Sequence, residues 1–200
     1  MLPRPVSIFD SSFPTSSIGA PPPMGKGSGQ VYLVTTSMKV GSKNVGPALL
    51  LVKETNHNDS WGPPGGQTDA TDHSVMFAAL REFNEEVGAD WTMLANSIGK
   101  MTLLRLKNQP SKNEGWVILV ETDAQTAENA LFGQDRSNWN LSKRMKTKLS
   151  QETGGYAFVA LSEIVNADPN SGAFKIGPNA VKLRYPKFTR DAAQLLQKLF

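Results

Sequence analysis

A glycine pair that follows two prolines and precedes a helical pattern constrains this chain more than any other stretch. The run Pro63-Pro64-Gly65-Gly66 permits a sharp turn and a close approach to another group, because glycine has no side chain. The residues from Ser74 onward then predict a helix that Gly88 ends. The chain therefore contains a tight loop joined to a helix, and we expect the other elements to pack around this unit.

The predicted helix carries an apolar stripe and, beside it, a cluster of acids. Glu82, Glu85 and Glu86 are spaced i, i+3 and i+4, so their side chains lie within reach of one another and repel unless a positive group lies among them. Arg81 precedes the first glutamate and can neutralise or orient a carboxylate. The apolar residues recur at helical spacing, as a face that packs on a sheet does: Met76, Leu80, Phe83 and Val87.

A hard divalent cation would relieve the repulsion between these acids. Magnesium prefers carboxylate oxygens, keeps several of its waters and commonly bridges protein carboxylates to substrate phosphates. The acidic face therefore predicts a metal-assisted site for a polyphosphate compound. The competing interpretation is a surface helix whose glutamates face water, as charge clusters usually do. The glycine pair upstream favours the metal site.

The segment from Arg81 to Ala89 resembles the second half of the Nudix box of Nudix hydrolases, Gly-x5-Glu-x7-Arg-Glu-U-x-Glu-Glu-x-Gly-U, where U is a bulky aliphatic residue. The arginine, the three glutamates and Gly88 stand in register. Phe83 is aromatic where an aliphatic residue is commoner, and Ala89 is smaller than the usual last residue. Trp61 also resembles the tryptophan of the W-x-x-P-G-G entrance common in the family.

The whole box would run over Gly66–Ala89, and its first half departs from the family pattern. Counting back from Arg81 places His73 at the family's first glutamate, whereas counting forward from Gly66 places Asp72 there. The loop is one residue longer than usual, and the first acidic position holds no glutamate. Either Asp72 or His73 could take the place of the first glutamate and contact metal or brace the loop, and the sequence does not decide between them.

The resemblance implies an α+β fold, a Nudix-like α/β/α sandwich with a central mixed β-sheet. It implies a hydrolase acting on phosphoric anhydrides, dependent on Mg²⁺ or Mn²⁺, that cleaves a diphosphate linkage. The implied metal ligands are Gly66, through its carbonyl, and Glu82, Glu85 and Glu86. Arg81 would orient Glu82, which is either a further ligand or the general base.

A second stretch also resembles the family. Glu152 precedes a strand around Tyr156 of the form Tyr-x-aromatic-Val-x-Leu, which leads into a short Ser-Glu-Ile helix. In relatives an acid at this position completes the metal set or acts as the base. The alternative interpretation of Glu152 is an exposed hairpin glutamate.

In the family, the Nudix helix contacts only the diphosphate, so other residues determine which nucleoside or other group the substrate carries. Gly65 and Gly66 are expected to bind it together with aromatic side chains that can stack on a base, although each aromatic is more often core. The aromatic candidates are Trp61, Trp116, Trp139 and Tyr156, with the long segment 123–150. Candidate substrates are a nucleoside triphosphate, a dinucleoside polyphosphate and a nucleotide sugar. The alternatives are an RNA-cap or RNA-end pyrophosphohydrolase and a catalytically weakened nucleotide-binding module.

Composition limits the other possibilities. With 200 residues, 39% of them hydrophobic, the chain supports one core, which we place in residues 30–200 after an extended or flexible arm over residues 1–29 rich in Pro, Ser and Gly. The lack of cysteine excludes disulfides and thiol catalysis, and two histidines are too few for a histidine-rich metal site.

No apolar run is long enough to span a membrane, so we expect a cytoplasmic protein. A homodimer stays open, and a net charge of +3 gives RNA contact little support beyond the basic cluster at 143–148.

Local patterns predict the remaining elements. Two strands are expected to form a hairpin, and the polar loop after it should leave His57 exposed. Thr189 is expected to cap a C-terminal helix that runs to Phe200. The other expected elements are strands at 30–36, 47–53, 98–106 and 116–122 and a helix at 124–132.

Overall fold

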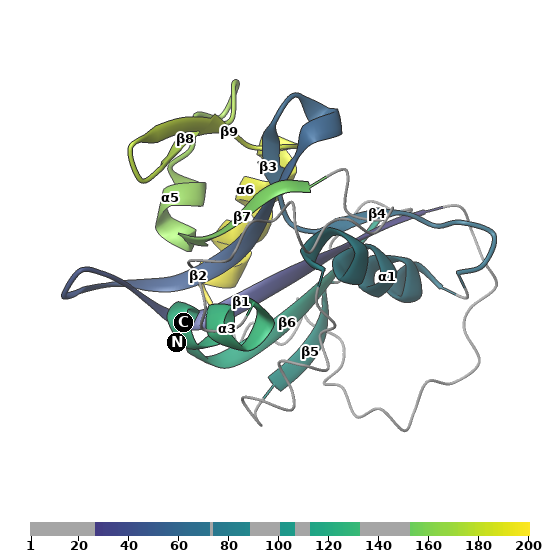
Figure 1. The fold of residues 1–200 in the computed structure, drawn as a ribbon, viewed down its shortest axis with the longest axis horizontal. Helices are drawn as coiled ribbons and strands as arrows, with labels where there is room; N and C mark the ends of the chain where they lie inside the picture. Colours follow the sequence, from purple (N-terminus) through teal and green to yellow (C-terminus); the bar gives the residue numbers. More distant parts are fainter. Residues whose placement is uncertain (1–26, 73, 89–100, 107–112, 133–152) are drawn as a thin grey trace.

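A computed structural model of the protein describes residues 27–72, 74–88, 101–106, 113–132 and 153–200. Within these ranges, seven strands form one mixed sheet, and a separate hairpin lies near the C-terminal end (Figure 1). The strands of the sheet are β1 (Ser28–Val40), β2 (Lys43–Glu54), β3 (Ser60–Gly62), β4 (Gly65–Gln67), β5 (Met101–Leu106), β6 (Asn113–Asp123) and β7 (Thr153–Ala160). The hairpin consists of β8 (Ala173–Ile176) and β9 (Asn179–Lys182), and the α-helices are α1 (Val75–Val87), α3 (Ala124–Phe132), α5 (Leu161–Val165) and α6 (Pro186–Gln197).

Residues 63–66, which contain the glycine pair and are called the glycine loop below, lie where the two longest strands separate. β1 and β2 pair antiparallel from the Val34–Leu49 pair up to their hairpin turn. Beyond that region, the start of β1 pairs with β4, and the end of β2 pairs with β3 on one side and β7 on the other. β6 runs parallel to β1, so the sheet is mixed, as predicted. β3 ends directly before the glycine loop and pairs with β2, while β4 contains the two glycines and pairs with β1, so the loop is fixed to both long strands.

Two hydrophobic cores lie on opposite faces of the sheet, because alternate side chains of each strand point to opposite sides. The first core joins the sheet to α1 and α3 and contains, among others, Val31, Leu33, Leu50, Val52, Phe83, Ile118, Leu131 and Phe132. The second joins the sheet to α5, α6 and the β8–β9 hairpin and contains, among others, Tyr32, Val34, Leu49, Leu51, Leu161, Ile164, Phe174 and Leu196. The predicted α/β/α sandwich is therefore confirmed, with α1 and α3 covering one face and α6 the other (Figure 1).

The elements with strong local signals lie where the sequence predicts them. The β1–β2 hairpin turns at Gly41, α3 has the predicted bounds, and His57 is exposed. The prediction for the last helix is wrong at its start: Pro186 occupies its first turn and Thr189 lies inside it. The hydroxyl of Thr189 donates to the carbonyl of Arg184 at 3.0 Å instead of capping the helix.

Parts of the predicted organisation fall outside the described residues. The N-terminal arm through residue 26, His73, Trp139 and Glu152 belong to these parts. The division between an arm over 1–29 and a domain over 30–200 stays a prediction, although β1 already begins at Ser28. No described helix is long and apolar enough to cross a membrane.

Candidate active site

Backbone packing requires glycine at position 65, and the observed position of the Glu82 carboxylate leaves no room for a side chain at position 66. A Cβ on Gly65 would lie 2.6 Å from the Cα of Gln30, on the neighbouring strand. A Cβ on Gly66 would lie 2.5 and 2.8 Å from the two carboxylate oxygens of Glu82. The sequence predicted a close approach at Gly66, and the structure shows that an acid of α1 makes it.

Local capping fixes the helix that carries these acids. The side chain of Ser74 accepts a hydrogen bond from the backbone N–H of Phe77 at 3.2 Å, which satisfies one free donor of the first turn. At the other end Gly88 adopts a left-handed conformation with φ of 66° and donates to Asn84. Both predicted ends of α1 are thus confirmed.

Glu86 connects α1 directly to the glycine loop. Its Oε2 accepts a hydrogen bond from the backbone N–H of Gly65 at 2.8 Å. The residue is only 7% exposed, so its carboxylate lies at the buried end of the acidic face. The loop and the helix are therefore joined by a side chain that the Nudix resemblance had assigned to metal.

Arg81 lies at the centre of the acidic cluster. Its Nη1 donates to Glu82 at 2.8 Å and to Glu85 at 3.3 Å. Its Nε and Nη2 donate to the two carboxylate oxygens of Asp72 at 3.1 and 2.9 Å, and Nη2 also donates to the carbonyl of Gln67 at 3.1 Å. The hydrogen bonds to Asp72 raise the pKa of Arg81, so this group stays charged. The chain itself thus supplies a positive group among its acids.

Asp72 braces the extended loop. Its side chain is 5% exposed and accepts from the backbone N–H of Asp69 at 2.8 Å as well as from Arg81. These bonds hold the pKa of Asp72 below its usual range, with the Arg81 hydrogen bond as the largest cause. Asp72 therefore braces the loop and holds Arg81, whereas His73, the other candidate for the first acidic position of the box, lies outside the described residues.

A pocket of about 620 Å³ opens beside the glycine pair. Glu82, Glu86, Gly65 and Gly66 line one part of it. The rest of its lining comes from the starts or ends of other elements: Ser28, Gly29, Gln30, Glu54, His57, Gln67, Arg184, Tyr185 and Phe188. Several predicted site residues therefore share one cavity with residues that the sequence did not single out.

Arg184 and Glu54 form the main unpredicted feature of this pocket. They make an ion pair through Nη1 and Oε2, and their side chains are 10% and 4% exposed. His57 Nδ1 lies 2.8 Å from the same oxygen of Glu54. Burial lowers the pKa of Arg184. No local pattern marks either residue, because they come together only through the fold.

The oxygen donors at the glycine loop fit a divalent cation such as magnesium. Among the described residues, no group of three or more acidic or histidine side chains lies close enough together to hold a metal ion. Glu82 and Glu86 nevertheless line the same pocket. Glu85 is not among the residues that line it and pairs with Arg81. Magnesium commonly binds through one or two carboxylates and retains water, so two acids and a loop carbonyl suffice.

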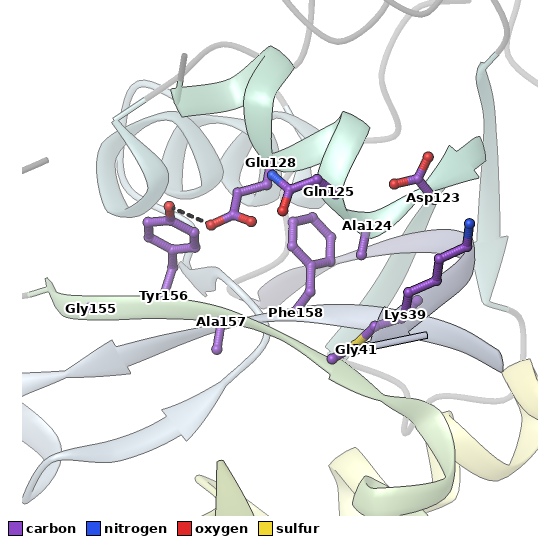
Figure 2. Close-up of a pocket in the computed structure, with 11 residues that line it drawn as sticks. Lys39, Gly41, Asp123, Ala124, Gln125, Glu128, Gly155, Tyr156, Ala157 and Phe158 are labelled. Carbon is purple, nitrogen blue, oxygen red and sulfur yellow. Dashed lines mark hydrogen bonds between the residues drawn. The ribbon is translucent and has the colours of Figure 1, made fainter. Parts of the chain in front are cut away.

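A second pocket, of about 870 Å³, lies between α3, β7 and the β1–β2 hairpin (Figure 2). Tyr156 and Phe158 project from β7 toward Gln125 and Glu128 of α3. The hydroxyl of Tyr156 donates to Glu128 at 3.0 Å, and its ring stacks on Phe132 with centroids 3.8 Å apart. The predicted substrate residue Tyr156 therefore lies in a pocket, outside the lining of the first one.

Two of the other predicted aromatic residues, Trp61 and Trp116, serve packing. Trp61 of β3 packs against the second core, and Trp116 of β6 packs against the first. Neither lines the two pockets. Binding of substrate by Trp61 stays a prediction, as does the role of Glu152.

Known proteins resemble the chain in both sequence pattern and structure. Residues 40–170 match the family profile described as NUDIX domain. No curated protein matches the sequence. A C. elegans Ap4A hydrolase in a binary complex is similar in structure, with 16% identity, coverage of 86% of this chain and 94% of that one, and a TM-score of 0.43. The C-terminal domain of mouse MUTYH, in complex with human PCNA, shows 10% identity, coverage of 88% and 91%, and a TM-score of 0.41.

Proposed function

Since the chain belongs to the Nudix family, and is thus a hydrolase acting on phosphoric anhydrides, we propose that it cleaves a diphosphate linkage in a nucleoside diphosphate derivative with Mg²⁺ or Mn²⁺. The observation that carries this proposal is the single pocket that Glu82, Glu86 and the pair Gly65–Gly66 share. Nucleoside triphosphates, dinucleoside polyphosphates and nucleotide sugars all contain such a linkage.

The metal would be held by Glu82, Glu86 and the carbonyl of Gly66, with Glu85 as a further ligand. When bound, a divalent cation offsets charge on the phosphate oxygens and lowers the pKa of coordinated water. The acids bear the charge that attracts the cation, and the absence of a side chain at Gly66 leaves room for its carbonyl.

The chain's own residues keep these acids in place. Arg81 holds Glu82 and Glu85 through Nη1, and Asp72 in turn holds Arg81 through a two-point contact. We propose that Arg81 acts as an orienting residue in this way. Either Glu82 or Glu152 would take the proton from the attacking water.

We assign the nucleoside part of the substrate to the second pocket. Tyr156 pairs with Val52 across the β2–β7 ladder, and Glu54, two residues further along β2, lines the first pocket. The register of β2 with β7 shifts between Lys53 and Glu54, and these neighbouring positions of β2 still connect the two pockets. We propose that one extended ligand occupies both cavities. The rings of Tyr156 and Phe158 offer surfaces for a base, and Glu128 offers an acceptor for a base amino group.

A hydrolysis screen over a nucleotide panel with Mg²⁺ or Mn²⁺, with the products separated and identified by chromatography, tests the activity. We expect Glu86→Gln to lower turnover by at least about 100-fold, because it removes the charge of a carboxylate in the pocket. The melting temperature should stay the same or rise, since a buried charge is removed while an acceptor for Gly65 is kept. Glu163→Gln, at an exposed residue of α5, is the matched control. Equal turnover of wild type, Glu85→Gln and Glu86→Gln would refute the assignment.

Substitution of Tyr156 tests the nucleoside pocket. Tyr156→Ala should raise KM for the preferred nucleotide by about tenfold or more, since base–aromatic stacking contributes about 1–3 kcal/mol. The turnover number should change much less, because Tyr156 lies outside the pocket of the acids. A KM that matches wild type across the panel would place the nucleoside elsewhere.

The same screen separates the remaining alternatives. Preference for capped RNA over free nucleotides would support the RNA-end alternative, and nucleotide binding without turnover would support a weakened binding module. The cytoplasmic location and the homodimer stay predictions.

A further inference from the structure

The connection from β9 to α6, together with the first turn of α6, supplies a wall of the diphosphate pocket from outside the family match. Arg184, Tyr185 and Phe188 all line this pocket, whereas the match ends at residue 170. Building on the proposed function, we propose that Arg184 is a positioning residue that fixes the Gly65–Gly66 segment for the bound diphosphate.

Arg184 holds the glycine loop from the side opposite to α1. Its Nη2 donates to the carbonyl of Gly65 at 3.1 Å, while the N–H of the same glycine donates to Glu86 at 2.8 Å. Both polar backbone groups of Gly65 are therefore held by charged side chains, and the two side chains come from helices or connections on different layers. A rotation of this glycine would break one of the two bonds.

The backbone around Arg184 is itself fixed to β3, the strand that precedes the glycine loop. The backbone N–H of Arg184 donates to the carbonyl of Trp61 at 2.6 Å, and Leu183 forms a parallel bridge with Trp61. On the other side, the carbonyl of Arg184 accepts from the hydroxyl of Thr189 in α6. The guanidinium thus starts from a defined backbone position, which a positioning role requires.

Glu54 keeps the guanidinium turned toward the loop. The buried ion pair engages Nη1, which leaves Nη2 for Gly65. A planar guanidinium can make both contacts at fixed angles, whereas a lysine amine presents a single nitrogen. Among the described residues, Oε1 of Glu54 has no hydrogen-bond partner, so loss of Arg184 would leave a buried carboxylate without its main partner.

Two measurements test this role. In metal-free protein, Arg184→Met should accelerate hydrogen exchange of the Gly65 amide by about tenfold or more, because the carbonyl anchor of that glycine is lost. In the loaded enzyme, it should lower kcat by about 100-fold with KM nearly unchanged, as expected for a small misplacement of reacting groups. Arg184→Lys should give intermediate values of both. Lys187→Met, at an exposed basic residue in the first turn of α6, should match wild type.

Failure of the proposed role of Arg184 can be distinguished from failure of the proposed function. Unchanged Gly65 exchange in Arg184→Met overturns the proposal, even if kcat falls, and so does a rise in KM without loss of kcat. If Arg184→Met does not fold, the double variant Glu54→Gln/Arg184→Met removes both buried charges. Its Gly65 amide must then exchange faster than that of wild type, as predicted for the single variant. If wild type cleaves none of the nucleotides tested, the proposed function fails, while the exchange measurement still decides the role of Arg184.

Discussion

Arg81 shows how a single residue makes the acidic face of α1 tolerable before any metal binds. Three acids lie within one turn, and the sequence suggested that a divalent cation could relieve their repulsion and that Arg81 could neutralise one carboxylate. The structure places the Arg81 guanidinium against Glu82 and Glu85, and Asp72 holds the guanidinium in turn. A metal would therefore enter a site whose charges are already partly balanced, and Arg81 would stay as the group that aims Glu82.

The contact between Asp72 and Arg81 makes a pH-dependent prediction. The arginine hydrogen bond holds the pKa of Asp72 below its ordinary value of about 3.9, so the ionised group stabilises the fold above that pH. This stabilisation is lost as the pH falls through the lowered pKa of the folded state. In EDTA, Asp72→Asn should lower the free energy of unfolding by about 2 kcal/mol at pH 7, and the difference should shrink markedly toward pH 2. Urea denaturation measures both values, with exposed Asp191→Asn as control. A difference that is the same at both pH values would contradict this account.

At the scale of elements, local signals determined what the sequence could predict. Ser74 and Gly88 mark the ends of α1 through contacts within a few residues, and both predictions are confirmed. The start of α6 depends on Tyr185 in a left-handed conformation followed by Pro186, which the choice of Thr189 as cap overlooked. The β8–β9 hairpin was not predicted, because its strands are short and mostly exposed.

Helix α1 also gives a prediction that separates stability from activity. Ser74→Ala removes the side-chain acceptor for the N–H of Phe77 and should cost about 1 kcal/mol of stability. Turnover per folded molecule should stay within about twofold, since the capping bond lies at the end of α1 opposite to Glu86. Thermal unfolding and steady-state kinetics check the two parts. Ser74→Asp, which keeps a capping acceptor, should retain wild-type stability.

At the scale of the whole molecule, the site is assembled across the sheet. The acids belong to the layer of α1, whereas Arg184 belongs to the connection leading into α6, on the other face. The sequence predicted the box half of the site, because its residues are neighbours on one helix. It gave no sign of Arg184, whose contact with Gly65 spans 119 positions of the chain. Long-range contacts of this kind follow from strand order, which local periodicity does not encode.

Because the sheet separates the two cores, equal damage on its two faces should have unequal effects on activity. Phe83 is fully buried against the first core, one residue after Glu82, and Leu196 is 1% exposed in the second core near the end of α6. Phe83→Ala and Leu196→Ala should each lower the free energy of unfolding by about 3 kcal/mol, through lost burial and a cavity. Only Phe83→Ala should also lower kcat, since relaxation around its cavity displaces the acids of α1. Both variants are compared by urea denaturation and by kinetics under conditions in which each is fully folded. A loss of kcat in Leu196→Ala as large as that in Phe83→Ala would show that the two layers do not act separately on the site.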